Sequence, residues 1–255
     1  MPASRPPSEF RSRIRDKSHV LGTFIKTPTS HTTEVIGSAG FDFVIIDQEH
    51  APFDRVTIDI CCLAAKAAGI AALVRVAEPT PASILSVLDV GAAGVLVPHV
   101  DTPAKAREIA AACRYRSGSR GFSNTTRAGD FGGASFADHI AAQDAGVTCV
   151  AMIEDERALD EIDAIAATEG IDAFFIGRGD LTAALGVEGM EKAVERIMEA
   201  GRRAGMTMMA LVSGRDDART MRGRGASAFV VSNDQNLLKA AATQALKDYG
   251  DPTAW

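Results

Sequence analysis

Short apolar runs alternate with amphipathic stretches along most of the chain. Eight such runs predict buried strands at residues 19–25, 43–46, 71–76, 95–97, 147–153, 173–176, 206–212 and 228–231. The stretches between them carry apolar residues at helical spacing, as in 30–38, 103–113 and 188–204. The pattern therefore predicts an α/β protein in which strands and helices alternate.

Helix signals support this alternation. Asp54 is a plausible N-cap for the helix that follows the second strand. Thr80 and Pro81 mark the start of another helix, and Ile84 and Leu88 lie on its buried stripe. Eight strand–helix units in 255 residues are typical of a single (β/α)8 TIM barrel. A doubly wound open sheet is the alternative, and the absence of G-x-G-x-x-G after the first strand favours the barrel.

The barrel is predicted to form one domain over residues 1–255, because no linker interrupts the pattern. Residues 1–9 are expected to be a flexible lead-in, and residues 250–255 a polar tail. The segment 115–135 contains five glycines and no sustained periodicity. Long irregular connections of this kind are usually functional, so this one is expected to cover a site or contact another subunit.

Two acidic residues follow neighbouring strands: Glu154 after the fifth and Asp180 just past the sixth. The carboxyl ends of parallel strands meet at one edge, which is where α/β folds bind ligands. Two carboxylates at that edge suit a divalent cation. The alternative is that both are helix N-caps or surface charges.

Other polar residues also end predicted strands. They are Lys26, His50, Arg75, His99 and the Ser232-Asn233-Asp234 turn. A metal pair, a candidate base and a cation together fit chemistry that passes through an enolate.

Each of these residues also has a structural alternative. Arg75 could simply pair with Asp47 or Glu49. Glu49, expected to point away from His50 across a strand, could be buried structure. Asp89 falls in the last turn of a helix, where the helix dipole disfavours a negative charge, so it requires either water or a cationic partner.

Composition and charge narrow the function classes. The formal net charge is −6 and the isoelectric point is near 5.4, which argues against a nucleic-acid surface. No apolar run approaches the roughly 20 residues of a membrane span. The four cysteines show no disulfide or metal spacing, and the polar amino terminus lacks the apolar core of a signal peptide. These features predict a cytoplasmic enzyme.

Five segments in order resemble the HpcH/HpaI aldolase/citrate lyase family, specifically its class II pyruvate aldolases. They are FDFVIIDQEHAPFD at 41–54, LVRV at 73–76, LDVGAAGVLVPHVDTPAKAREIAAACRYRSGSRGFS at 88–123, MIEDERALDEIDAI at 152–165 and GIDAFFIGRGDLTAALG at 170–186. The resemblance covers roughly residues 20–235. It implies a divalent-metal-dependent carbon–carbon lyase, an aldehyde-lyase whose partners are a small 2-oxo acid and an aldehyde.

The resemblance also implies roles for individual residues. Glu154 and Asp180 match the ligands of Mg²⁺ or Mn²⁺, with Co²⁺ or Zn²⁺ as further options. His50 matches the general base, and Asp89 the acid that orients it. Substrate-binding roles fall to four positions: Arg75, which stabilises the enolate oxygen, Met152, Gly179, whose backbone holds the carboxylate, and Asp180.

The implied reaction is reversible aldol cleavage of a 4-hydroxy-2-oxo acid into pyruvate or hydroxypyruvate plus an aldehyde. Two alternatives remain open: a citrate-lyase- or malyl-CoA-lyase-like enzyme, and a non-catalytic barrel that binds an oxo acid. Met152 stands where many relatives carry glutamine, and V-A-E-P-T-P follows position 75 in place of a Pro-Pro-Trp-type segment. Both departures leave the substrate open. The family further implies a homo-oligomer, a trimer or a hexamer with helices exchanged between subunits.

Overall fold

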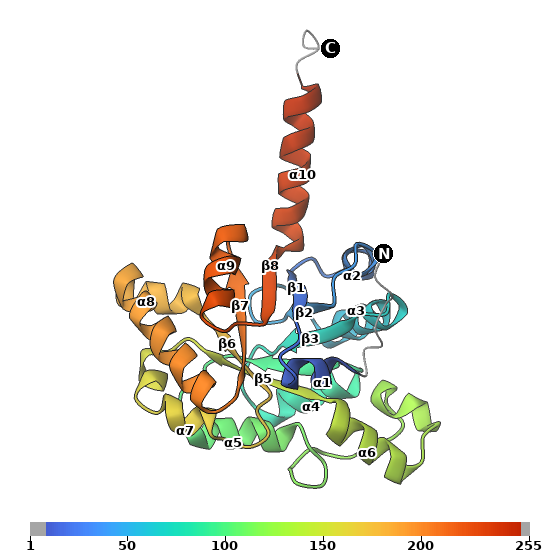
Figure 1. The fold of residues 1–255 in the computed structure, drawn as a ribbon. Coiled ribbons are helices and arrows are strands. Elements are labelled where there is room, and N and C mark those ends of the chain that lie inside the picture. The colour runs from blue at the N-terminus through green and yellow to red at the C-terminus, as the bar shows by residue number, and fades with distance from the viewer. Residues whose placement is uncertain (1–8, 251–255) are drawn as a thin grey trace.

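Eight parallel strands close into a barrel in the computed structural model, which describes residues 9–250 (Figure 1). The strands are β1 (Val20–Ile25), β2 (Phe43–Asp47), β3 (Ala71–Arg75), β4 (Gly94–Val97), β5 (Thr148–Ile153), β6 (Ala173–Ile176), β7 (Thr207–Val212) and β8 (Ala228–Asn233). Each pairs with its neighbour in sequence, and β8 pairs with β1 to complete the ring. The predicted (β/α)8 barrel is confirmed.

Helices cover the outside of the barrel and one end of it. They are α1 (Phe10–Arg15), α2 (Ser30–Ser38), α3 (Arg55–Ala67), α4 (Pro81–Asp89), α5 (Pro103–Ala112), α6 (Phe136–Gly146), α7 (Ile162–Ala166), α8 (Arg178–Arg203), α9 (Arg215–Gly223) and α10 (Asp234–Tyr249). The two predicted caps are confirmed. Asp54 accepts the N–H of Thr57 at 2.7 Å, and Thr80 accepts that of Ser83 at 3.2 Å.

Buried apolar side chains form two clusters, one inside the ring of strands and one between the strands and the helices. Inside the ring, apolar residues from every strand form one cluster, and α1 closes its amino end with Phe10 and Ile14. The Phe10 ring lies 5.1 Å from that of Phe43 on β2. A larger cluster packs the outer strand faces against the helices. Burial on both faces explains why the strands appear in the sequence as unbroken apolar runs.

The largest departure from the predicted elements lies after β6. A helix was expected from residue 188, but α8 starts at Arg178, directly after the strand, and is kinked at Gly186. Gly186 has a φ of 72°, a conformation that glycine adopts at little cost. The early start brings Gly179 and Asp180 into the first turn of the helix. The segment 115–135 also contains a 3-10 turn, η2 (Arg127–Gly132).

The last helix projects away from the barrel (Figure 1). α10 starts at β8 and extends outward, with Leu238, Leu246 and Tyr249 between 72% and 73% exposed. Within residues 9–250, no helix combines the length and the apolar character needed to span a bilayer. The predicted flexible lead-in and polar tail lie almost entirely outside the described residues.

Candidate active site

The carboxyl ends of the strands meet at one mouth of the barrel and form a cavity of about 1360 Å³. Among its lining residues are Arg75, Met152, Gly179 and Asp180, all of which the sequence placed in the site. Met152 is 4% exposed and belongs to the barrel's inner cluster. Phe24 and Phe175 of the same cluster also line the cavity, so its floor is apolar where these three side chains meet it.

Asp47, at the end of β2, is the centre of a buried ion-pair network. Its two oxygens accept from Arg75 Nε at 2.9 Å and Arg75 Nη2 at 2.8 Å, and Lys26 Nζ lies 3.3 Å away. Burial alone would raise the pKa of Asp47, but the hydrogen bonds and charge of Arg75 lower it below its usual value. Arg75, 6% exposed, is held rigidly at the mouth. Arg75 therefore forms the ion pair with Asp47 that the structural alternative expected, and it also lines the cavity.

Glu49 connects this network to two histidines. Its Oε2 lies 3.2 Å from Arg75 Nη1 and 3.6 Å from His50 Nε2, while its Oε1 lies 3.7 Å from His99 Nε2. Oε2 is buried without a hydrogen bond of good geometry to any described residue. The expectation that Glu49 points away from His50 was wrong, because β2 ends at Asp47 and residues 48–50 form a turn in which strand alternation no longer applies.

Glu154 follows β5 and is almost completely buried, at 3% exposure. Its Oε1 accepts the backbone N–H of His99 at 2.8 Å. His99 has a φ of 54°, a left-handed conformation that is unusual for a residue with a side chain. Gly177, after β6, packs directly on this carboxylate, since a Cβ at position 177 would lie 2.4 Å from Glu154 Cβ. The local backbone is thus shaped around the acid.

The electrostatic environment of Glu154 is unusual. Burial, together with the negative charges of Asp180 and Glu49, raises the pKa of Glu154 to about 7, although His99 acts in the opposite direction. No arginine or lysine among residues 9–250 pairs with it. A cation would stabilise the ionised form, and the nearby Asp180 would supply a second carboxylate.

The donors for such a cation are few. In the described part of the chain, no group of three or more His, Cys, Asp or Glu side chains is arranged to hold a metal. Asp180 is exposed in the first turn of α8. Two carboxylates fit an ion that takes its other oxygen ligands from substrate or water, as Mg²⁺ usually does. The metal-ligand roles of Glu154 and Asp180 stay predictions.

Asp89 lies at the end of the barrel opposite the candidate active site. It is at the carboxyl end of α4, shortly before Ala93, whose N–H bonds to Ala72 at the amino end of β3. Its cationic partner is Arg120, whose Nη2 lies 3.3 Å away and whose side chain is fully buried. Asp89 therefore does not orient His50 within one chain, and the cation required by the dipole argument is Arg120. The His50 side chain is 55% exposed at the opposite end of the barrel.

The chain is similar to proteins of known family over nearly its whole length. Residues 21–241 match the family model described as HpcH/HpaI aldolase/citrate lyase. A protein named 5-keto-4-deoxy-D-glucarate aldolase, from Shigella dysenteriae serotype 1 (strain Sd197), is 35% identical over 249 residues, covering 95% of this chain and 96% of that protein.

Solved structures agree with this match. A HpcH/HpaI aldolase/citrate lyase family protein from Burkholderia cenocepacia J2315 superposes with a TM-score of 0.90 at 30% identity, covering 96% of this chain and all of that one. A structure named citrate synthase SbnG gives a TM-score of 0.85 at 28% identity, covering 94% and 97%. The chain belongs to the HpcH/HpaI aldolase/citrate lyase family.

Proposed function

We propose that this protein is a divalent-metal-dependent aldolase that reversibly cleaves 4-hydroxy-2-oxo acids into pyruvate or hydroxypyruvate plus an aldehyde. The buried carboxylate of Glu154 carries the proposal, because no arginine or lysine of residues 9–250 pairs with it and because the charge of Asp180 is close enough to raise its pKa. Family membership supports lyase chemistry at this site.

When bound by Glu154 and Asp180, a divalent ion supplies a Lewis acid for the ketone and carboxylate of the oxo acid. Mg²⁺ or Mn²⁺ suits the two hard oxygen donors, with Co²⁺ or Zn²⁺ as further options. The first turn of α8 offers the N–H of Gly179 to the substrate carboxylate, since the first N–H groups of a helix have no partner within it.

Arg75 and His50 have distinct roles in the proposal. Arg75 is fixed by Asp47 and stabilises negative charge on the enolate oxygen. His50 removes the proton of the 4-hydroxyl group, directly or through water, so that the C3–C4 bond breaks and the aldehyde leaves. Glu49 Oε2 lies 3.6 Å from Nε2 of the His50 ring and holds the ring beside the mouth.

The name of the curated relatives suggests a substrate. Numbered from its C6 carboxylate, 5-keto-4-deoxy-D-glucarate is a 2-oxo acid with a methylene at C3 and a hydroxyl at C4, as the proposed reaction requires. Its cleavage gives pyruvate and a three-carbon aldehyde that carries a carboxylate. We propose this compound as the first substrate to test. Met152, which cannot donate the hydrogen bond of an amide, makes the choice between pyruvate and hydroxypyruvate an open part of the test.

The direct test is an aldol-addition screen. Pyruvate and hydroxypyruvate are offered with several aldehydes to EDTA-treated protein, and then to the same protein with Mg²⁺ or Mn²⁺ restored. Product formation only with metal supports the proposal, whereas full activity after EDTA treatment contradicts it. A parallel assay with malyl-CoA addresses the thioester alternative, and exclusive turnover of the thioester would replace the aldolase assignment. Binding of an oxo acid without any turnover would favour a non-catalytic barrel.

We also propose that the protein is a homo-oligomer, a trimer or hexamer, in which α10 packs against a second copy. Exposed apolar residues along α10, including Leu238 and Leu246, would be covered in such an assembly. Light scattering of the purified protein tests this. A double change, Leu238→Glu with Leu246→Glu, should reduce the assembly size. A cytoplasmic location stays a prediction.

A further inference from the structure

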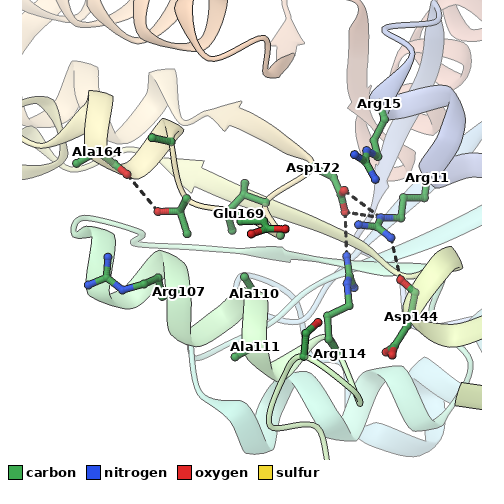
Figure 2. Close-up of a pocket in the computed structure, with 15 residues that line it drawn as sticks. Arg11, Arg15, Arg107, Ala110, Ala111, Arg114, Asp144, Ala164, Glu169 and Asp172 are labelled. Carbon is green, nitrogen blue, oxygen red and sulfur yellow. Dashed lines mark hydrogen bonds and ion pairs between the residues drawn. The ribbon is translucent and has the colours of Figure 1, made fainter. Parts of the chain in front are cut away.

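A second cavity, of about 730 Å³, lies at the amino end of the barrel, opposite the candidate active site. It opens between α1, α5 and the loop that leads into β6 (Figure 2). Its ionisable lining consists of four arginines and three acids: Arg11, Arg15, Arg107, Arg114, Asp144, Glu169 and Asp172.

Asp172 is the buried centre of the cavity, at 6% exposure. It accepts two hydrogen bonds from Arg11 Nε, at 2.9 and 3.0 Å, and one from Arg114 Nη2 at 3.3 Å. The backbone N–H of Cys149 donates a fourth, at 2.9 Å. One carboxylate thus faces two guanidinium groups that are both largely shielded from water, so one positive charge there is not balanced (Figure 2).

The carboxylate of Asp144, which also lines the cavity, forms no ion pair with either of these two guanidinium groups. Arg11 Nη1 donates to the backbone carbonyls of Asp144 and Ala145, at 2.8 and 3.2 Å. The carboxylate of Asp144 accepts instead from the backbone N–H groups of Tyr115 and Arg116. Burial, together with the charge of Arg114, lowers the pKa of Arg11 despite the opposing effect of Asp172.

Two more arginines reach the cavity from its rim. Arg15 extends from α1 and Arg107 from α5, on opposite sides of the pocket (Figure 2). Both are exposed, and neither forms an ion pair or a side-chain hydrogen bond with the residues between 9 and 250. Glu169 is also exposed on the rim, where its side chain has room to turn toward solvent.

We propose that this pocket binds a small dianion. Arg11 and Arg114 inside the pocket, and Arg15 and Arg107 at its rim, donate hydrogen bonds to two or more oxygens of this ligand. Guanidinium groups match the geometry of carboxylates and phosphates and bind them through paired N–H donors. The chemical class is therefore a phosphate-bearing or dicarboxylate molecule. The dianion joins α1 to α5 across the closed end of the barrel.

This site is separate from the catalytic mouth. Asp172 precedes β6 and Gly177 follows it, so the strand separates the two sites by about 15 Å. A substrate at the mouth and a dianion at the amino end therefore do not compete for the same residues. The proposal predicts that a 2-oxo acid does not displace the dianion.

The test is isothermal titration calorimetry of the metal-free, full-length protein. Inorganic phosphate and succinate are titrated separately, with ionic strength held constant by sodium chloride. Saturable binding of at least one probe is expected, and pyruvate at high concentration should leave its affinity unchanged. The double variant Arg15→Gln with Arg107→Gln should bind that probe about tenfold more weakly, because two charge-assisted contacts are lost from exposed positions.

The matched control is Arg55→Gln with Arg222→Gln, which removes the same charge from two exposed arginines that line neither this cavity nor the one at the mouth. Its affinity should stay within about twofold of the unchanged protein. Binding of phosphate alone identifies a phosphate-bearing ligand, and binding of succinate alone a dicarboxylate. The proposal is overturned if neither probe binds saturably, if pyruvate displaces the probe, or if the control loses as much affinity as the rim variant.

Discussion

Each end of the barrel contains a buried carboxylate, and the two carboxylates differ in the partners that surround them. At the amino end, Asp172 lies between two arginines and accepts four hydrogen bonds. At the carboxyl end, Glu154 is equally buried but accepts only the backbone N–H of His99 among the described residues, at 2.8 Å. The His99 ring lies 3.5 Å from the same oxygen, and no arginine or lysine of residues 9–250 pairs with Glu154. Burying a charge with few partners is costly, so Asp172 is better satisfied within the chain than Glu154.

The contrast separates structural acids from functional ones. Asp47, a few ångströms from Arg75 at the same mouth, has a lowered pKa, whereas the pKa of Glu154 is raised to about 7. A buried acid with a perturbed pKa beside a second carboxylate is a candidate for ligand chemistry. The comparison therefore predicts that Glu154 serves catalysis at some cost in stability, and that Asp172 serves stability rather than catalysis.

Glu154→Gln should have the largest effect. The amide keeps the size of the side chain but removes the charge needed to bind a divalent ion, so metal-dependent kcat/KM should fall by roughly 10³-fold or more. Folding raises the pKa of Glu154 above its ordinary 4.5. In the metal-free protein, the stabilisation that comes from this group is therefore present at low pH and is lost as the pH rises toward 7. The variant should therefore unfold at the same or a higher urea concentration than unchanged protein at pH 8. Glu156→Gln, an exposed neighbour, is the control.

Asp172→Asn should have the opposite effect to Glu154→Gln: it should lower stability and leave activity nearly unchanged. Losing the buried charge leaves Arg11 and Arg114 without an anionic partner, so the free energy of unfolding should fall by about 3–5 kcal/mol. Activity per folded molecule should stay within about twofold, because the change is at the other end of β6. Urea unfolding combined with steady-state kinetics measures both quantities. A large loss of kcat without loss of stability would refute the division of roles, and the exposed Asp160→Asn supplies the baseline.

Glu49→Gln should weaken catalysis by about 10- to 100-fold while leaving metal binding intact. Burial alone would lower the pKa of His99, but the neighbouring carboxylates, Glu49 among them, raise it. Removing this charge should therefore lower the pKa of the His99 ring, which an NMR titration of the histidine rings measures. A pure loss of packing would lower activity without moving this pKa. Glu78→Gln, an exposed acid on the next connection, should change neither.

Asp217→Asn tests a more exposed ion pair at the mouth and should have the smallest effect. Asp217 accepts from both terminal nitrogens of Arg178 at 2.8 and 2.6 Å, and its pKa is lowered to about 2. A lowered pKa stabilises the fold above the ordinary value near 3.8, and this stabilisation is lost as pH falls toward 2. The variant should thus lose about 1 kcal/mol at pH 7. Urea titrations at pH 7 and pH 3 should show the difference shrinking, and a constant difference would exclude the ion pair as its cause.

Local sequence information was enough for the fold. Asp54 and Thr80 cap the helices they were expected to cap, and the apolar runs became the eight strands, because burial on both faces and capping depend on neighbouring residues. The order of the strand-end residues also placed Arg75 and Asp180 at one cavity, and the resemblance added Met152 and Gly179 to it. The five segments of the resemblance identified the family that the comparisons then established.

Contacts between distant parts of the chain were not predictable in this way. The sequence by itself determined which residues end the strands and hence which chemistry collects at the mouth. Only the tertiary structure decided that Glu49 turns toward two histidines, that Asp89 pairs with Arg120, and that Arg11 and Asp172, 161 positions apart, meet at the closed end. Such pairings depend on how the ring closes and how turns direct side chains, and neither leaves a periodic signal in the sequence.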